Sequence, residues 1–148
     1  MADPVIFFAP NQMDNLLKSG LDSAIRSGVS PVLAARLLGS GKGNEAYLLV
    51  VRADPGLVEI HEHWDDVVII RSGRGILKTG YEVTGEKKEE KGHSGNWTGG
   101  NIEGGKDRNL SPGDFIVIPA LLAHQYIPNS GDTLTYWTIK VRASKANE

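Results

Sequence analysis

The sequence predicts an all-β domain, an antiparallel sandwich or barrel, with a short helical segment near the N-terminus. Short apolar segments, many of them alternating with period two, recur from residue 32 onward. Gly and Pro, 18 and 7 of the 148 residues, fall between these segments, where they favour turns. Only residues 11–27 have apolar side chains at helical spacing. Many short strands separated by turns are typical of sandwiches and barrels.

The helical segment is expected over residues 11–27. The apolar residues that recur in it at roughly helical spacing are Leu16, Leu17, Leu21 and Ile25. Asn11 is expected to cap its first turn, because an Asn side chain can accept a backbone hydrogen bond there. Gly20 and Gly28 predict that the helix is short or broken.

Eight strands are expected within one domain that covers residues 32–143, preceded by an N-terminal extension over residues 1–31. The predicted strands lie at 32–38, 46–52, 57–63, 66–72, 74–79, 114–118, 124–128 and 133–141. A domain of this size has room for one hydrophobic core.

The polar, Gly-rich stretch 84–109 is expected to be a long loop. Its charge run, 86–91, alternates in sign and predicts a solvated loop or a hairpin tip. Long loops in compact domains are usually functional, so a lid over a nearby pocket is the alternative. His93 lies in this stretch and is expected to face solvent, or else to close on that pocket.

Composition excludes several function classes. The formal net charge of -2 and the lack of a basic block argue against nucleic-acid binding. No apolar run reaches the ~20 residues that a membrane span requires. With no Cys in the sequence, any metal site must use His, carboxylates, carbonyls or water. We expect a cytoplasmic protein; a periplasmic or secreted one stays possible if a signal segment is missing from this sequence.

One alternating segment carries potential metal ligands. In residues 57–63, strict alternation places Glu59, His61 and His63 on one face of a strand. Asp66 opens the next predicted strand across a tight turn. Two His and a carboxylate with open positions suit non-haem iron and similar divalent metals. Taken alone, a His-x-His pair on a strand is more often two polar side chains that face solvent than a pair of metal ligands.

A second segment adds another His and brings a resemblance. Residues 113–119 predict a turn and a buried strand that ends at Pro119, and His124 then opens another strand. With this spacing the sequence resembles the cupins, whose two motifs are matched by Gly56, His61, His63, Asp66 and Gly73, and by Gly113, Pro119 and His124.

The sequence departs from the cupin motifs in several places. The acidic residue is Asp66 rather than Glu, and it follows His63 more closely than the motif requires. Leu121 replaces the Gly of the second motif, and Pro128 takes the place of its Asn. These departures leave open how the acidic residue takes part in the site.

The resemblance implies a double-stranded β-helix (jelly-roll) barrel. It further implies that His61, His63, Asp66 and His124 converge on one divalent transition metal: Fe, Mn, Ni, Cu or Zn. Because the Asp side chain is short, binding of Asp66 through water, or its replacement by Asp65 or Glu59, stays open. Homodimers are frequent in this family and are expected here.

The resemblance also implies a pocket for a small organic molecule inside the barrel. An enzyme of dioxygenase, isomerase or lyase type is the first hypothesis, with Glu59 and Tyr126 as candidate catalytic residues. The alternatives are a non-catalytic cupin that binds a sugar-like molecule, and a barrel for oligomerisation or storage. The predicted pocket walls are Val68, Ile70, Thr135, Trp137 and Ile139, with core packing as the alternative role for Trp137 and Tyr126.

Overall fold

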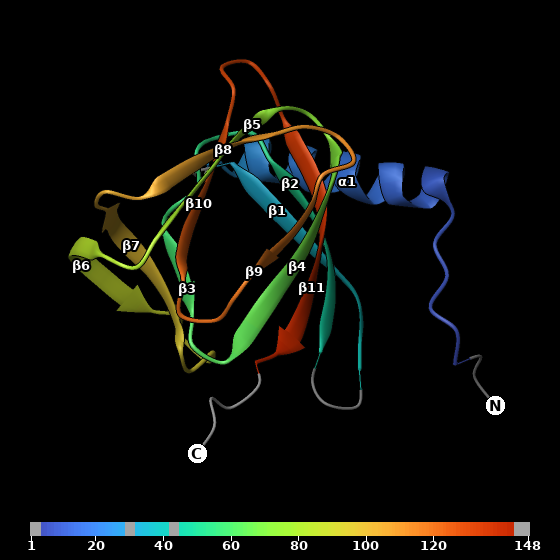
Figure 1. Ribbon diagram of the computed structural model, residues 1–148. Helices are drawn as coiled ribbons and strands as arrows, with labels where there is room; N and C mark the ends of the chain where they lie inside the picture. The colour runs from blue at the N-terminus through green and yellow to red at the C-terminus, as the bar shows by residue number, and fades with distance from the viewer. Residues whose placement is uncertain (1–3, 29–31, 42–44, 144–148) are drawn as a thin grey trace.

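The computed structural model describes residues 4–28, 32–41 and 45–143 (Figure 1). Within them, one helix precedes a series of strands. The elements are α1 (Pro10–Ser27), β1 (Leu33–Ser40), β2 (Ala46–Arg52), β3 (Glu59–His61), β4 (Trp64–Ser72), β5 (Gly75–Gly80), β6 (Val83–Glu89), β7 (Asn96–Ile102), β8 (Lys106–Leu110), β9 (Phe115–Ile118), β10 (Ala123–Pro128) and β11 (Leu134–Arg142).

The strands form two sheets that enclose the core, so the predicted all-β barrel is confirmed. One sheet has the order β1-β2-β11-β4-β9 and the other β6-β7-β3-β10-β5-β8, and the neighbouring strands run antiparallel. Side chains from both sheets meet in the interior. The buried members of this core are Val50, Val68, Ile70, Leu77, Leu110, Ile118, Tyr126, Leu134 and Tyr136.

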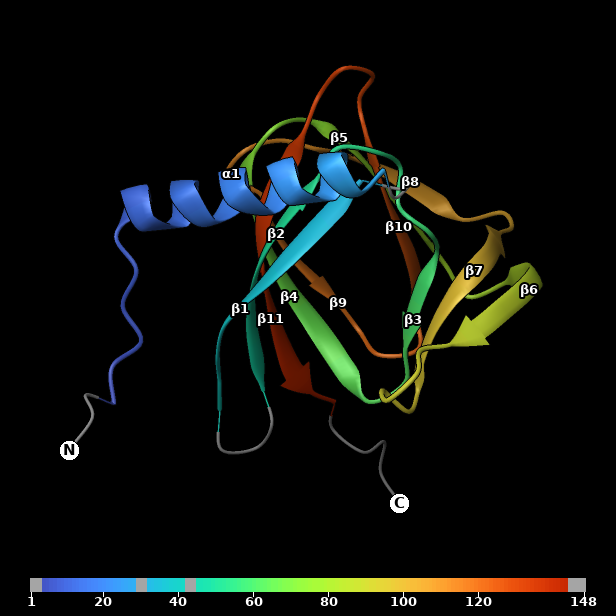
Figure 2. The same ribbon diagram turned by 180° about the vertical axis from the view of Figure 1, so that it is seen from behind.

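Helix α1 covers the outer face of β1 and β2 (Figure 2). Leu17 of the helix packs with Leu49 and Val51 of β2 in a second apolar cluster outside the barrel. Because β2 has apolar side chains on both faces, it lies between two cores. The face of the five-stranded sheet that is turned toward the helix is therefore apolar as well.

Two details of the helix differ from the expectation. The residue that caps the helix is Ala9 rather than Asn11, and the Ala9 N–H donates to Oε1 of Gln12 at 2.7 Å. Gly20 does not interrupt the helix, because it is buried where α1 approaches Ala34 of β1 closely. The helix ends at Gly28, whose φ of 66° lies in the left-handed region that favours glycine.

The stretch 84–109 is not the long loop that its composition predicts. Most of it forms strands: β6 and β7 make a hairpin that extends the six-stranded sheet, and β8 pairs with β5 at the other edge. The side chains of β6 after Val83 and Thr84 are exposed, so backbone pairing with β7 rather than burial holds this strand. His93 lies in the exposed turn between β6 and β7.

The predicted N-terminal extension is only partly covered by the described residues. Its residues 1–3 and 29–31 lie outside them, so the predicted boundary after residue 31 falls at the edge of the described part. Among the described residues, α1 is too polar to cross a bilayer, and no membrane-spanning helix is found.

Candidate metal centre

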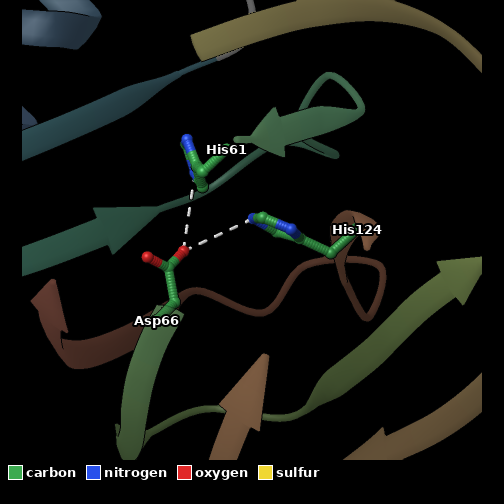
Figure 3. Close-up of side chains that lie close together, drawn as sticks. All are labelled: His61, Asp66 and His124. Atoms are coloured by element: carbon green, nitrogen blue, oxygen red, sulfur yellow. Dashed lines mark ion pairs between the residues drawn. The ribbon is translucent and has the colours of Figure 1, made fainter. Parts of the chain in front are cut away.

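Three buried side chains inside the barrel bring their ligand atoms together. In His61, Asp66 and His124, one donor atom of each residue lies within 4.8 Å of the others. Oδ2 of Asp66 is 3.5 Å from Nε2 of His61 and 3.6 Å from Nε2 of His124 (Figure 3). Three of the four predicted metal ligands therefore lie in one group.

Each member of this group comes from a different strand. His61 is the last residue of β3, Asp66 lies near the start of β4, and His124 follows the first residue of β10. β3 and β10 are neighbours in the six-stranded sheet, whereas β4 belongs to the five-stranded sheet. The carboxylate thus faces the two imidazoles across the interior of the barrel.

Hydrogen bonds at Nδ1 orient both imidazole rings. Nδ1 of His61 lies 3.0 Å from Oδ1 of Asn96, and Nδ1 of His124 lies 3.3 Å from the carbonyl of Leu122. Both partners are acceptors, so each Nδ1 carries the proton and each Nε2 keeps its lone pair. Histidine ligands of metals are typically held in this way.

The environment of His124 suits the coordination of a cation. Its Nε2 is buried and has no hydrogen-bond partner. Burial is the main cause that lowers the pKa of His124, outweighing the carboxylates of Glu59 and Asp66, so the ring stays neutral. A buried acceptor without a partner is costly, and coordination of a cation would satisfy it. The three donors therefore fit a divalent metal with open positions.

Lys140, which was not among the predicted site residues, also contacts this group. Its Nζ donates to Oδ1 of Asp66 at 2.7 Å and lies 3.1 Å from Nε2 of His61. The register explains the contact, because Lys140 of β11 lies directly opposite Asp66 of β4. The site thus holds a cation supplied by the chain itself.

The orientation of β11 is the reverse of the expected one. Tyr136, buried in the interior core, and Lys140 face the barrel interior, while Trp137 packs on the outer apolar cluster around Leu17. The prediction that Trp137 and Ile139 line the pocket is therefore wrong, and core packing against the helix is the correct alternative for Trp137. Val68 and Ile70 do face the interior, as predicted.

Glu59 lies beside the group and faces the same interior. Its Oε2 is 3.9 Å from Nε2 of His124 and 3.4 Å from Nη2 of Arg52. Arg52 is almost fully buried and also donates from Nε to the hydroxyl of Tyr136 at 3.3 Å. Gly56 makes this arrangement possible, since a Cβ there would collide with the Arg52 guanidinium.

Tyr126 is a core residue beside the site. Its ring stacks on Tyr136 with centroids 4.7 Å apart, and the edge contact to His124 has a centroid distance of 5.8 Å. Burial raises the pKa of Tyr126 well above its ordinary value, so the phenol stays protonated. Its hydroxyl has no hydrogen-bond partner among the described residues. In this position Tyr126 can steady the His124 ring but cannot serve as a base.

His63, the fourth predicted ligand, lies outside the group. β3 ends at His61 and β4 begins at Trp64, so His63 belongs to the bend between them and is exposed. The strand alternation that would place His63 on the same face as His61 ends at His61 itself. Asp65, considered as a substitute for Asp66, instead accepts a hydrogen bond from the Ala120 N–H at 2.8 Å.

The side chains at the site differ in their exposure to solvent. The exposed fraction of the side chain is 2% for His124 and 3% for Asp66, but 18% for Lys140 and 26% for Glu59. A separate apolar cavity of about 390 Å³ lies on the outer face of the five-stranded sheet, where Phe8, Met13 and Trp137 line it. That cavity has no contact with the His and Asp group.

Comparison with known proteins identifies the fold. No protein-family model matches the sequence, and no curated protein matches it. Among solved structures, KdgF from Halomonas sp. is 18% identical, with a TM-score of 0.51 over 76% of this chain and 82% of that one. A cupin-2 domain protein from Rhodospirillum rubrum is 17% identical, with a TM-score of 0.52 over 78% of this chain. These similarities show the cupin fold.

The chain is shorter than some of these structures. It spans 62% of the Rhodospirillum rubrum protein and 28% of a vicilin from Solanum melongena. The vicilin is 13% identical, with a TM-score of 0.52 over 76% of this chain. Its structure is described as having different anionic ligands in structurally similar pockets.

Proposed function

We propose that this cupin-fold chain binds one divalent transition metal through His61, Asp66 and His124 and acts as an enzyme on a small organic molecule. One observation carries the proposal: two buried imidazoles, each held at Nδ1, present unprotonated Nε2 atoms to one buried carboxylate. Two nitrogens and an oxygen suit Fe, Mn, Ni, Cu or Zn, and they leave open positions for a small molecule.

The bound metal would supply Lewis acidity to an oxygen atom of the small molecule. The protein would contribute the rest. Glu59 has the most exposed side chain of the interior carboxylates and lies 3.9 Å from the Nε2 of His124, so it can exchange a proton with a molecule bound at the site. Arg52, at 3.4 Å from Glu59, keeps that carboxylate directed into the barrel. A carboxylate in this position favours isomerase or lyase chemistry, in which a proton is transferred.

Metal titration tests the proposal. The protein is stripped with a chelator and titrated with Mn²⁺, Fe²⁺, Ni²⁺, Cu²⁺ and Zn²⁺ by calorimetry. We expect one ion per chain, and at least a roughly 100-fold weaker affinity in His61→Ala and His124→Ala, because each removes one of three ligands. His63→Ala and His93→Ala are matched controls, since both residues are exposed and outside the group.

Two results would contradict the metal site. One is the absence of binding by any of the five ions at millimolar concentration. The other is an affinity loss in His63→Ala as large as that in His124→Ala. The catalytic part is tested separately, by asking whether a small molecule that stabilises the metal-loaded protein is converted, and whether Glu59→Gln stops the conversion without weakening metal binding.

A second candidate function is the metal-free binding of a small anion without catalysis. The two interior cations, Arg52 and Lys140, favour it, and the Solanum melongena vicilin, which shares the fold, is described as having anionic ligands in its own pockets. Binding of small carboxylates or phosphate to chelator-treated protein, with recovery of the unchanged ligand, would support this function over the first.

We also propose that the chain forms a homodimer. The outer face of the five-stranded sheet beyond α1 exposes apolar side chains, including Phe115 at 65% and Val117 at 54%. β9, which carries both residues, is an edge strand. Light scattering after size exclusion should give twice the chain mass, and Phe115→Glu should reduce it to the mass of one chain.

A further inference from the structure

We propose that Lys140 is a built-in counter-cation of the metal centre, and that a divalent ion binds only by displacing the Lys140 ammonium from Asp66 and His61. This inference rests on the proposed metal-binding function. It assigns a role to a residue outside the ligand set, since Lys140 touches two of the three ligands but cannot itself bind a cation while it is charged.

His61 has one free lone pair for two possible partners. The Nδ1 of His61 carries a proton, because it faces Oδ1, the side-chain amide oxygen of Asn96. The Nε2 of His61 therefore has one lone pair, and it accepts a hydrogen bond from the Lys140 ammonium at 3.1 Å. The same lone pair cannot bind a metal at the same time. His61 has either Lys140 or the metal as its partner.

A bound divalent ion and the Lys140 ammonium would lie close together. The ammonium is 2.7 Å from Oδ1 of Asp66, and Oδ2 is 3.5 Å from Nε2 of His61 and 3.6 Å from Nε2 of His124. A divalent ion bound to these atoms would sit within a few ångströms of the ammonium in a poorly solvated interior. Repulsion between two cations at that distance is strong, because water does not screen it there.

Of Asp66 and Lys140, only Lys140 is free to move away. Asp66 is 3% exposed, and its strand is paired on both sides, with Lys140 of β11 and Ile118 of β9. Lys140 has a long flexible side chain that is 18% exposed, on a strand that ends two residues later. The ammonium can therefore swing toward solvent when an ion arrives, while the carboxylate stays in place.

This arrangement gives the site two states. Without an ion, Lys140 neutralises the buried carboxylate and satisfies His61, so that of the three ligands His124 alone has a donor atom without a partner. With an ion, all three ligands are satisfied and Lys140 is released. A cation can therefore bind only if its binding free energy exceeds the cost of displacing the ammonium from Asp66 and His61.

The test compares metal affinity in variants that lack the charge. Lys140→Leu and Lys140→Gln both remove the ammonium, and Gln keeps a polar side chain in case Leu impairs folding. Lys78→Leu is the matched control, because Lys78 is a half-exposed strand lysine with its own carboxylate neighbour, Asp107, at 4.0 Å. Each protein is stripped with a chelator, checked by circular dichroism, and titrated with Mn²⁺ and Zn²⁺ by calorimetry.

We expect affinities at least ~10-fold higher in both Lys140 variants than in the wild type, and an unchanged affinity in Lys78→Leu. A second readout is the melting temperature. Without metal it should fall in Lys140→Leu, because Asp66 loses its partner, and metal should raise it by more than in the wild type.

The outcomes separate this inference from the metal site itself. If the wild type and the Lys140 variants bind metal equally well, the role of Lys140 is refuted and the metal site stands. If only the variants bind, the role of Lys140 is supported and the wild-type metal function fails. If none of the proteins binds metal, both proposals are overturned.

Discussion

Nζ of Lys140 lies 2.7 Å from Oδ1 of Asp66, and the two residues are direct partners in the register of β4 and β11. The pair lies beside the imidazoles of His61 and His124, so it belongs to the interior rather than to the surface. β4 and β11 also form the longest paired stretch of the five-stranded sheet. Their register holds the Asp66 carboxylate at the place where the two His side chains converge.

Asp66→Ala should destabilise the metal-free protein, because the Lys140 ammonium loses its carboxylate partner and must stay unpaired or turn toward solvent. A hydrogen bond to a charged group contributes about 1.5–3 kcal/mol to the free energy of unfolding. Urea denaturation of the chelator-treated protein measures this loss. Asp107→Ala, at the exposed Lys78–Asp107 pair, is the control and should cost less than about 1 kcal/mol.

The double variant with Asp66→Ala and Lys140→Leu should recover part of that loss, because no buried charge is left unpaired. A loss of stability in the double variant that equals the sum of the losses in Asp66→Ala and Lys140→Leu would instead show that the two residues do not interact. The buried pair would then have no energetic role.

Asn96→Ala should weaken metal binding without removing a ligand. Oδ1 of Asn96 on β7 accepts a hydrogen bond from Nδ1 of His61 at 3.0 Å, and losing such a partner typically costs about 10- to 100-fold in metal affinity. Calorimetric titration measures the change. Asn101→Ala is the matched control on the same strand, since Asn101 is exposed. Equal affinities in the two variants would refute the role of Asn96.

Leu121→Gly should stabilise the protein. Leu121 is the one described residue other than glycine with positive φ, at 72°, and its N–H donates to the carbonyl of His61 at 2.8 Å. A side chain in this region costs about 1–2 kcal/mol, and the exposed Leu121 side chain offers little packing in return. We expect a gain of about 1 kcal/mol in chemical denaturation.

Leu121→Ala is the control for this change, because alanine keeps the Cβ that causes the strain. It should not reproduce the gain. A glycine variant that is no more stable than the alanine variant would show that the backbone at this turn is not strained, and that the Gly of the cupin motif is dispensable here.

The protein should lose stability at high pH through Tyr136. Burial raises the pKa of Tyr136 to about 12, although the neighbouring Arg52 opposes the shift. Because the folded state keeps a proton that the unfolded chain releases near pH 10, the free energy of unfolding should fall from about pH 10 to about pH 12. Urea denaturation at several pH values tests this, and Tyr136→Phe should flatten the decline.

The absorbance of phenolate at 295 nm gives an independent check. The wild-type titration minus that of Tyr136→Phe should show a single transition with a midpoint near 12. A difference curve with its midpoint near 10 would mean that water reaches the Tyr136 hydroxyl and that the Arg52–Tyr136 contact is not buried.

The strands that the sequence predicts well are those with a strong apolar pattern. All eight predicted strands, which are β1 to β5 and β9 to β11, lie within two residues of the predicted ranges, because their side chains alternate or form apolar runs. β6 was not predictable in this way. Its exposed side chains carry no apolar period, and its partner β7 rather than the core determines its conformation.

The candidate site was predicted in part. His61, Asp66 and His124 meet as their spacing suggests, whereas His63 does not, because the alternation of β3 ends before it. Lys140 was missed for a different reason. Both faces of the five-stranded sheet are apolar, one toward the core and one toward α1, so the large apolar residues of β11 do not indicate which face is inside.

The most direct test of the central claim is a crystal structure of the protein grown with Co²⁺, with anomalous maps at the cobalt edge. We expect one ion per chain within roughly 2.0–2.3 Å of Nε2 of His61, Nε2 of His124 and a carboxylate oxygen of Asp66, with Nζ of Lys140 turned away. A map without a peak between these three residues, or with a peak at His63 instead, would contradict the proposed metal centre.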